Sequence, residues 1–243
     1  MKETRERQVT RIEAGRTEEA QERLVVEQEF TITLRGERLL HTICSPSYLK
    51  ELAYGYLVSE GWIRAHHDVV SFTQQGNGFD IKLSDDAPSP QQAILPQPVE
   101  STFTLSADVL LVAAKECLNR GIIFRETGGT HAVALGAQSG LLSFFEDISR
   151  SCALEKVLGD ALLRGFAFDE TFVFLSSRLP KQMLLKVARC EIPIVGAVSA
   201  PTFDAVEEAQ RLGICVCGFV REQRLNVYSH GWRLGLNKAK RQR

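Results

Sequence analysis

The sequence has almost no net charge and no long apolar run. Its 243 residues contain 29 Lys and Arg against 30 Asp and Glu, which gives a formal net charge of −1. This balance argues against a protein that holds nucleic acid by bulk electrostatics. No apolar run approaches the roughly 20 residues that cross a bilayer, and the charged N-terminus lacks the apolar core of a signal peptide. We therefore expect a cytoplasmic protein without a membrane span.

Several motifs of common active sites are also missing. The chain contains no G-x-x-x-x-G-K-[ST], G-x-G-x-x-G, G-x-S-x-G or H-E-x-x-H pattern. A zinc deaminase needs His-X-Glu and Cys-X-X-Cys, but Val133 stands where His131 would require a Glu, and no Cys-X-X-Cys occurs. We expect no bound zinc and six free thiols. Cys215 and Cys217, two apart in an apolar strand, are expected to be buried packing residues.

The pattern of charge, proline and apolar residues divides the chain into five parts. Residues 1–22 mix both charges without an apolar face and are expected to form a flexible tail or a frayed helix. Residues 23–85 predict a small strand–strand–helix–strand–strand module of the α+β type. Residues 86–104 contain four prolines and no periodicity, which indicates a linker. Residues 105–230 predict an α/β core, and residues 231–243 a solvated basic tail.

The pattern of residues 105–230 predicts a three-layer α/β/α sheet. Its apolar strands at 171–176, 192–199 and 214–220 alternate with helices at 179–191 and 201–213. Short apolar strands of this kind are typical of a sheet that helices cover on both faces.

Polar residues follow three of these strands and mark a candidate ligand site. The junctions are residues 176–178, 199–202 and 221–224. Open α/β sheets bind ligands at the carboxyl ends of their strands, and hydroxyls, helix N-termini and guanidinium groups suit anions. A fourth junction combines Gly128 and Gly129 with His131. Together these features favour a nucleotide-sized anionic ligand, although a tight turn with a hydrogen-bonded histidine also explains the fourth junction.

Cys152 lies in the first turn of a predicted amphipathic helix. Ser149 or Ser151 is a suitable N-cap. The helix dipole favours a thiolate at this position, and Arg150 and Lys156 are close in sequence. Two interpretations remain open, a reactive nucleophile and a small packing residue, and we favour packing.

At these residues the chain resembles the FdhD/NarQ family of formate dehydrogenase accessory proteins. The matching segments are ELAYGYLVSEGWI, FRETGGTHAVAL, EDISRSCALEKVLGDAL, a long run from 176 to 220, and REQRLNVY. The resemblance implies a core similar to cytidine deaminases without their zinc, and a homodimer. It also implies sulfur transfer from a cysteine desulfurase to the molybdenum bis-(molybdopterin guanine dinucleotide) cofactor, which then enters formate dehydrogenase.

The resemblance also implies the residues that bind this cofactor and its GDP-like guanine nucleotide ends. They are Thr127, Gly128, Gly129, His131, Asp147, Arg150, Lys156, Arg178, Pro201, Thr202, Phe219, Val220, Arg221, Glu222, Gln223, Arg224 and Asn226. Cys152 is the candidate catalytic thiol.

The chain departs from the family where the family carries its persulfide cysteine. The corresponding stretch, ILPQPVESTFTLS, contains no cysteine, and Ser149, Ser151 and Cys152 replace the Gly, His and Asn of a family motif. Three functions remain: a sulfur relay through another thiol, a cofactor carrier or chaperone without a relay, and an unrelated nucleotide-handling enzyme. The last of these would use His131 and Asp147 as an acid–base pair.

Overall fold

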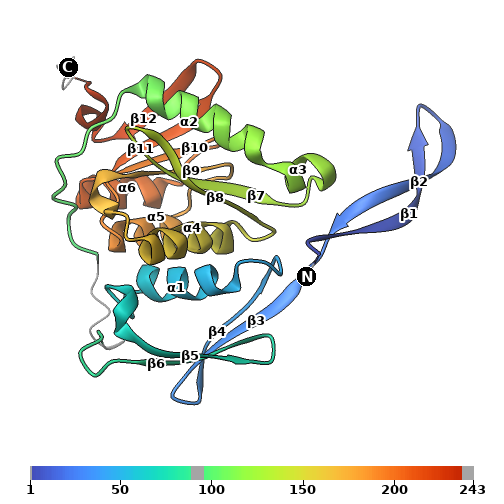
Figure 1. Cartoon of the computed structure of the whole chain (residues 1–243). Coiled ribbons are helices and arrows are strands. Elements are labelled where there is room, and N and C mark those ends of the chain that lie inside the picture. The colour runs from blue at the N-terminus through green and yellow to red at the C-terminus, as the bar shows by residue number, and fades with distance from the viewer. Residues whose placement is uncertain (1, 89–95, 237–243) are drawn as a thin grey trace.

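The computed structural model describes residues 2–88 and 96–236. Figure 1 shows a large sheet with helices above and below it, a smaller sheet beneath, and a long hairpin that projects from the body. In this part of the chain no helix has the length and apolar character needed to cross a membrane.

The large sheet has six strands in the order β12-β11-β10-β9-β7-β8. The strands are β7 (His131–Ala137), β8 (Gly140–Asp147), β9 (Phe172–Leu175), β10 (Ile194–Ala197), β11 (Cys215–Arg221) and β12 (Arg224–Ser229). The central strands β9, β10 and β11 are parallel, and the others pair antiparallel. Each predicted core strand is therefore confirmed.

Helices cover both faces of this sheet. On one face lies α2 (Ala107–Arg120), where Leu110 packs in a cluster with Phe174. The other face carries α4 (Arg150–Arg164), α5 (Lys181–Arg189) and α6 (Phe203–Leu212), and their apolar stripes join a second cluster. The predicted N-cap is Ser149, because its Oγ accepts from Cys152 N, and Ser106 caps α2 in the same way by accepting from Val109 N. The three-layer α/β/α architecture is confirmed.

The smaller sheet belongs to the predicted N-terminal module. Its strands lie in the order β4-β3-β6-β5, so that β4 is an edge strand. The elements of the module are β3 (Gln28–Leu34), β4 (Glu37–Cys44), α1 (Leu49–Ser59), β5 (Val69–Gln75) and β6 (Gly78–Leu83). A short 3-10 helix lies in the module at His66–Asp68. Two more lie outside it, at Phe168–Glu170 and Gly231–Leu234.

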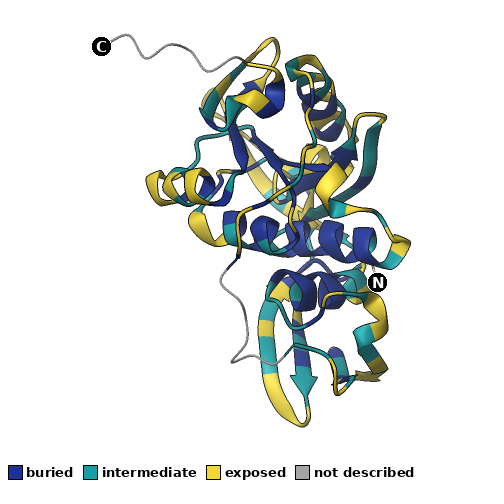
Figure 2. Ribbon diagram, turned by 90° about the vertical axis from the view of Figure 1, so that its left-hand side faces the viewer, coloured by how far each residue is buried: buried dark blue, intermediate teal, exposed yellow. Residues whose placement is uncertain are grey.

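Two glycines let α1 of the small module touch α4 of the core. A Cβ at Gly55 would lie 1.6 Å from the carbonyl oxygen of Glu155, and one at Gly159 would lie 1.9 Å from that of Glu51. The helices therefore cross with their backbones in contact, which no larger residue allows. Figure 2 shows that the residues between the large and the small sheet are mostly buried.

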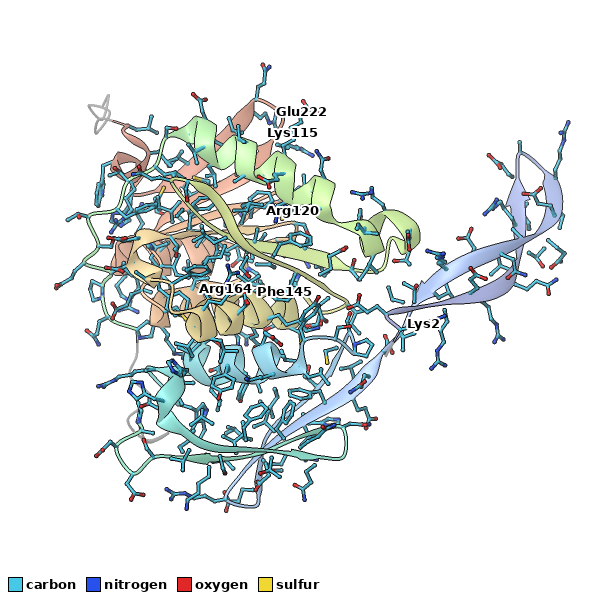
Figure 3. The ribbon with its side chains drawn as sticks, in the orientation of Figure 1. Lys2, Lys115, Arg120, Phe145, Arg164 and Glu222 are labelled. Atoms are coloured by element: carbon cyan, nitrogen blue, oxygen red, sulfur yellow. The ribbon has the colours of Figure 1, made fainter. Side chains whose placement is uncertain are left out.

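The prediction of a tail or frayed helix over residues 1–22 is wrong. β1 (Thr4–Glu13) and β2 (Arg16–Val25) form an antiparallel hairpin. Charges across the strands replace apolar alternation: Arg11 lies 3.5 Å from Glu18 and 2.5 Å from Glu22. Figure 3 shows the hairpin side chains standing out on both faces, with Lys2 labelled at its base.

The prediction of a solvated tail from residue 231 is also wrong at its start. Arg233 is only 1% exposed. Its guanidinium donates to the backbone carbonyls of Val99, Ser101, Phe103 and Gly213 at 2.7 to 3.2 Å. Residues 96–104 of the expected linker are thereby fixed to the core. Residues 89–95 of that linker and residues 237–243 of the tail lie outside the described residues.

Candidate functional site

The predicted junctions gather at one edge of the six-stranded sheet. The parallel strands β9, β10 and β11 end there. The antiparallel strand β7 begins at the same edge with His131, which pairs with Asp147 at the end of β8. Sheet topology thus brings segments from 127 to 226 together, as expected for a ligand site at strand carboxyl ends.

Hydrogen bonds join neighbouring junctions into one surface. Ala132 N donates to Ser176 Oγ at 2.8 Å, which links the start of β7 to the loop after β9. Phe219 N donates to Ser199 O at 3.3 Å, which links β11 to the loop after β10. Leu179 also forms a parallel bridge with Pro201. The edge is a continuous structure rather than a set of separate loops.

The Thr127–Gly129 turn follows α3 (Ile122–Thr127), a short helix that is not evident from the sequence pattern. Gly128 ends this helix with φ +67°, a conformation that favours glycine. A Cβ at Gly129 would lie 2.9 Å from the side chain of Val25, so the turn packs tightly against the base of the hairpin. Thr127 Oγ1 accepts from Gly129 N at 3.1 Å. These contacts fix the shape of the turn.

Glu146 supports this turn, although its sequence context does not mark it as a site residue. Its carboxylate accepts from Ile123 N at 3.0 Å, Phe124 N at 2.8 Å and Thr130 Oγ1 at 2.9 Å. An acidic side chain at a helix N-terminus is a favourable arrangement. The only signal in the sequence is that Glu146 is acidic and adjacent to Asp147. Its closeness to α3 becomes visible only from the pairing of β7 with β8.

Asp147 and Lys156 form a fully buried ion pair instead of facing the edge. Lys156 Nζ lies 2.6 Å from Asp147 Oδ2, and both side chains are 0% exposed. Asp147 also accepts from Ser45 N at 3.1 Å and Ser149 N at 2.8 Å, and Lys156 donates to Ser45 O at 3.1 Å. Burial raises the pKa of Asp147, and the ammonium of Lys156 opposes that rise. Their polar atoms are engaged within the protein.

Cys152 lies at the expected helix start, but its surroundings differ from those predicted. The residue is 2% exposed, and its Sγ lies 3.7 Å from Thr42 Oγ1 and 3.9 Å from Ile43 O. Burial, together with the carboxylates of Glu155 and Asp147, raises the pKa of Cys152 to about 11. The prediction of a thiolate-favouring environment is therefore wrong for this conformation. Its role as a nucleophile stays a prediction.

The other cysteines are buried as well. Burial raises the pKa of Cys44, Cys117 and Cys190 to about 12. Cys215 and Cys217 are 0% exposed, which confirms their predicted burial, and their sulfur atoms lie 3.9 Å apart. No cysteine of the chain reaches the surface in this conformation.

Several cations of the edge have no acidic partner. Within the described ranges, Arg150, Arg178, Arg221 and Arg224 form no salt bridge. Arg178, Arg221 and Arg224 are exposed. Unpaired guanidinium groups suit phosphate, which they can contact with two parallel hydrogen bonds.

His131 is half-buried beside Arg150. Burial lowers the pKa of His131, and the charge of Arg150 lowers it further. Its cross-strand partner Asp147 is already bound to Lys156, so the acid–base pair of the third functional hypothesis has no free carboxylate.

The β11–β12 turn forms the outer end of the edge. Val220 is buried, whereas Arg221, Glu222, Gln223 and Arg224 are exposed at its tip. Figure 3 labels Glu222 there. Phe219 and Glu222 adopt φ values of +52° and +55°, and Asn226 pairs with Gly218 across the strands. Pro201 packs here too, because a Cβ at Gly218 would lie 2.9 Å from its Cδ. Thr202 caps α6 by accepting from Ala205 N.

Metal ligands do not cluster in the part of the chain that the structure describes. Among residues 2–88 and 96–236, no group of three His, Cys, Asp or Glu side chains is placed to hold a metal ion. The arrangement at the edge therefore offers arginines, hydroxyls and backbone amides as its available groups.

The fold and this edge define a mixed α/β protein with an arginine-bearing surface at its strand ends. A sequence model of the FdhD/NarQ family matches residues 25–95 and 86–235. The sulfur carrier protein FdhD of Methanothermobacter thermautotrophicus is 34% identical over 228 residues, which cover 88% of this chain and 92% of the relative. That of Bacillus subtilis is 30% identical over 258 residues, covering 94% and 96%. The chain belongs to the FdhD/NarQ family.

A solved structure supports the fold independently. The crystal structure of a protein described as a formate dehydrogenase accessory protein from Desulfotalea psychrophila matches with a TM-score of 0.82 at 22% identity. The match covers 95% of this chain and 99% of that chain.

Proposed function

We propose that this chain is a formate dehydrogenase accessory protein that binds the molybdenum bis-(molybdopterin guanine dinucleotide) cofactor as its substrate. The observation that carries the proposal is the gathering of unpaired arginines at the carboxyl edge of the sheet. The cofactor has two guanine dinucleotide arms, each with a pyrophosphate, and is therefore strongly anionic. Arginines without internal partners can bind such groups at little cost, because no existing ion pair has to break.

In this proposal, different residues of the edge bind the phosphates and the guanine base of the cofactor. Arg178 follows β9 and Arg224 begins β12, so they approach the edge from two different junctions. The exposed turn from Phe219 to Arg224 is the segment that the family resemblance assigns to the guanine dinucleotide. Asp147 and Lys156, in contrast, act from beneath the surface, since their polar atoms are engaged with each other and with Ser45.

The full proposal includes the partners that the family implies. A cysteine desulfurase supplies sulfur, a molybdenum-dependent formate dehydrogenase receives the cofactor, and the protein acts as a cytoplasmic homodimer. The names of the relatives, sulfur carrier protein and formate dehydrogenase accessory protein, support the donor and acceptor ends of this scheme.

The proposed function has two versions, one with a sulfur relay and one without. In the relay, the Cys152 thiolate attacks the outer sulfur of a desulfurase persulfide, forms a new S–S bond and releases the desulfurase thiolate, which takes up the proton lost by Cys152. The position of Cys152 in the first turn of α4, two residues after Arg150, favours this version. In the alternative, the chain is a cofactor carrier or chaperone without a relay, which the burial of all six thiols favours.

A nucleotide-binding measurement tests the binding proposal. GDP, which carries the guanine and a pyrophosphate, is titrated by calorimetry into the native chain and into Arg178→Ala and Arg224→Ala. A charge-assisted bond is worth roughly 1.5–3 kcal/mol, so each variant is expected to bind at least tenfold more weakly. Arg211→Ala is the matched control, because Arg211 already pairs with Glu208 on the exposed face of α6. Unchanged affinity in both edge variants would reject the site.

Intact-mass analysis separates the two versions of the chemistry. The native chain and Cys152→Ser are incubated with a cysteine desulfurase and cysteine. One added sulfur atom that is absent from the variant identifies Cys152 as the relay thiol. No added sulfur on a chain that still binds GDP identifies a carrier.

A further inference from the structure

Cys152 lies only one strand below the surface. Its sulfur contacts Thr42 Oγ1 and Ile43 O, and on the outer side of the same strand the Ile43 side chain is 48% exposed. Thr42 and Ile43 therefore lie between the thiol and solvent on this side, and we call residues 42–45, which include them, the cover segment. Most of this segment is the end of β4, an edge strand that pairs with β3 on one side only. Edge strands and strand ends open more easily than central strands.

The last residue of the cover segment is tied to the core by three hydrogen bonds. Ser45 N donates to Asp147 Oδ2 at 3.1 Å, and Ser45 O accepts from Lys156 Nζ at 3.1 Å. Ser45 Oγ accepts from Ile148 N at 3.2 Å. The buried ion pair thus uses both of its charges to hold the backbone of a single residue that lies more than 100 positions away in sequence.

A buried ion pair is a costly way to gain stability, because apolar residues of similar volume often stabilise as well or better. In some proteins such a pair instead specifies position, since each charge needs its partner in place. Here the position specified is that of Ser45, and with it the cover segment. The neighbouring buried pair of Lys186 and Glu155, 2.7 Å apart, joins α5 to α4 and makes no contact with Ser45.

We propose that Asp147 and Lys156 form a latch that closes the cover segment over Cys152, so that the thiol becomes reactive only when residues 42–45 lift. With the cover lifted, Cys152 faces solvent in the first turn of α4, where backbone amides and the helix dipole favour a thiolate. A sulfur donor then has to displace the cover segment before it can reach the thiol. The biological meaning of the latch rests on the proposed function, but its test does not.

Site-resolved alkylation tests the latch on the full-length chain. Native protein is labelled with iodoacetamide, and the rate at each of the six cysteines is read by peptide mass spectrometry. Lys156→Met removes the cation and its bond to Ser45. We expect the Cys152 rate to rise at least tenfold, while the rates of Cys117 and Cys190 stay within twofold of native.

Two further variants keep the outcome decisive. Asp147→Asn combined with Lys156→Met removes both charges, and so preserves folding if the single change leaves Asp147 unpaired. Lys186→Met is the matched control, because it breaks the neighbouring buried pair and is expected to leave Cys152 protected. Unchanged Cys152 labelling in a folded latch variant overturns the proposal. A parallel rise at all six cysteines also overturns it, because the pair would then hold the whole core. The alkylation result does not depend on whether the chain binds GDP. The GDP titration likewise does not depend on the alkylation result.

Discussion

Replacement of Gly159 by alanine tests whether α1 and α4 really cross in backbone contact. In an ordinary helix interior this change stabilises by roughly 0.5–1 kcal/mol, because glycine loses more conformational freedom on folding. Here the new Cβ would lie 1.9 Å from the carbonyl oxygen of Glu51 and 2.7 Å from Gly55 N. Both atoms belong to the backbone of α1, so no side-chain rotation can relieve the contact. The clash and the helix propensity therefore act in opposite directions.

The magnitude follows from how far the helices must separate. Cβ atoms essentially never approach other heavy atoms within 3.0 Å, so the contact with Glu51 O has to lengthen by about 1 Å or more. Overpacking of a buried interface costs roughly 1–3 kcal/mol, and sometimes more. Moving α1 away also loosens the small module from the core. After the propensity gain is subtracted, we expect Gly159→Ala to lower the free energy of unfolding by about 1–2 kcal/mol.

Urea unfolding followed by circular dichroism measures this change. Glu207→Ala on the exposed face of α6 is the control, since it changes helix propensity without a buried contact and should alter stability by less than about 0.5 kcal/mol. A Gly159→Ala protein as stable as the native chain, or more stable, would refute the backbone contact.

Three other predictions concern the termini and pH. Arg233→Ala is expected to lower the urea-derived free energy of unfolding by about 3–5 kcal/mol, because four buried backbone carbonyls lose their donor. Deletion of residues 2–22 should change it by less than about 1 kcal/mol, because the exposed hairpin buries little. Stability should fall above pH 9, because unfolding frees thiols whose folded pKa is about 12 to ionise at their ordinary value of 9.0. Between pH 9 and 10, Cys190→Ala should recover about 1 kcal/mol of that loss.

The sequence predicted what local periodicity and capping determine. The alternating strands and helices expected from residue 171 to residue 220 are all present, as is the N-cap Ser149. The meeting of the junctions at one edge was also foreseeable, because parallel strands carry their carboxyl ends to the same side.

What the sequence could not reveal depends on distant partners. β1 and β2 have no apolar alternation, and their pairing is visible only in charges that meet across the strands, such as Arg11 and Glu22. Asp147 and Lys156 were expected to face a ligand, but Ser45 engages both from another module. Cys152 was placed correctly in the first turn of α4, yet Thr42 and Ile43 cover it and reverse the expected direction of its pKa.

The contact between α1 and α4 has a consequence for synthesis on the ribosome. α1 ends at Ser59, whereas α4 begins at Arg150. Translation at roughly 5–20 residues per second separates the emergence of the two helices by several seconds or more. During that interval the face of α1 around Gly55 has no partner, and the apolar side chains beside it stay open to water. The module that contains α1 therefore emerges before α4 but is completed only when α4 reaches it.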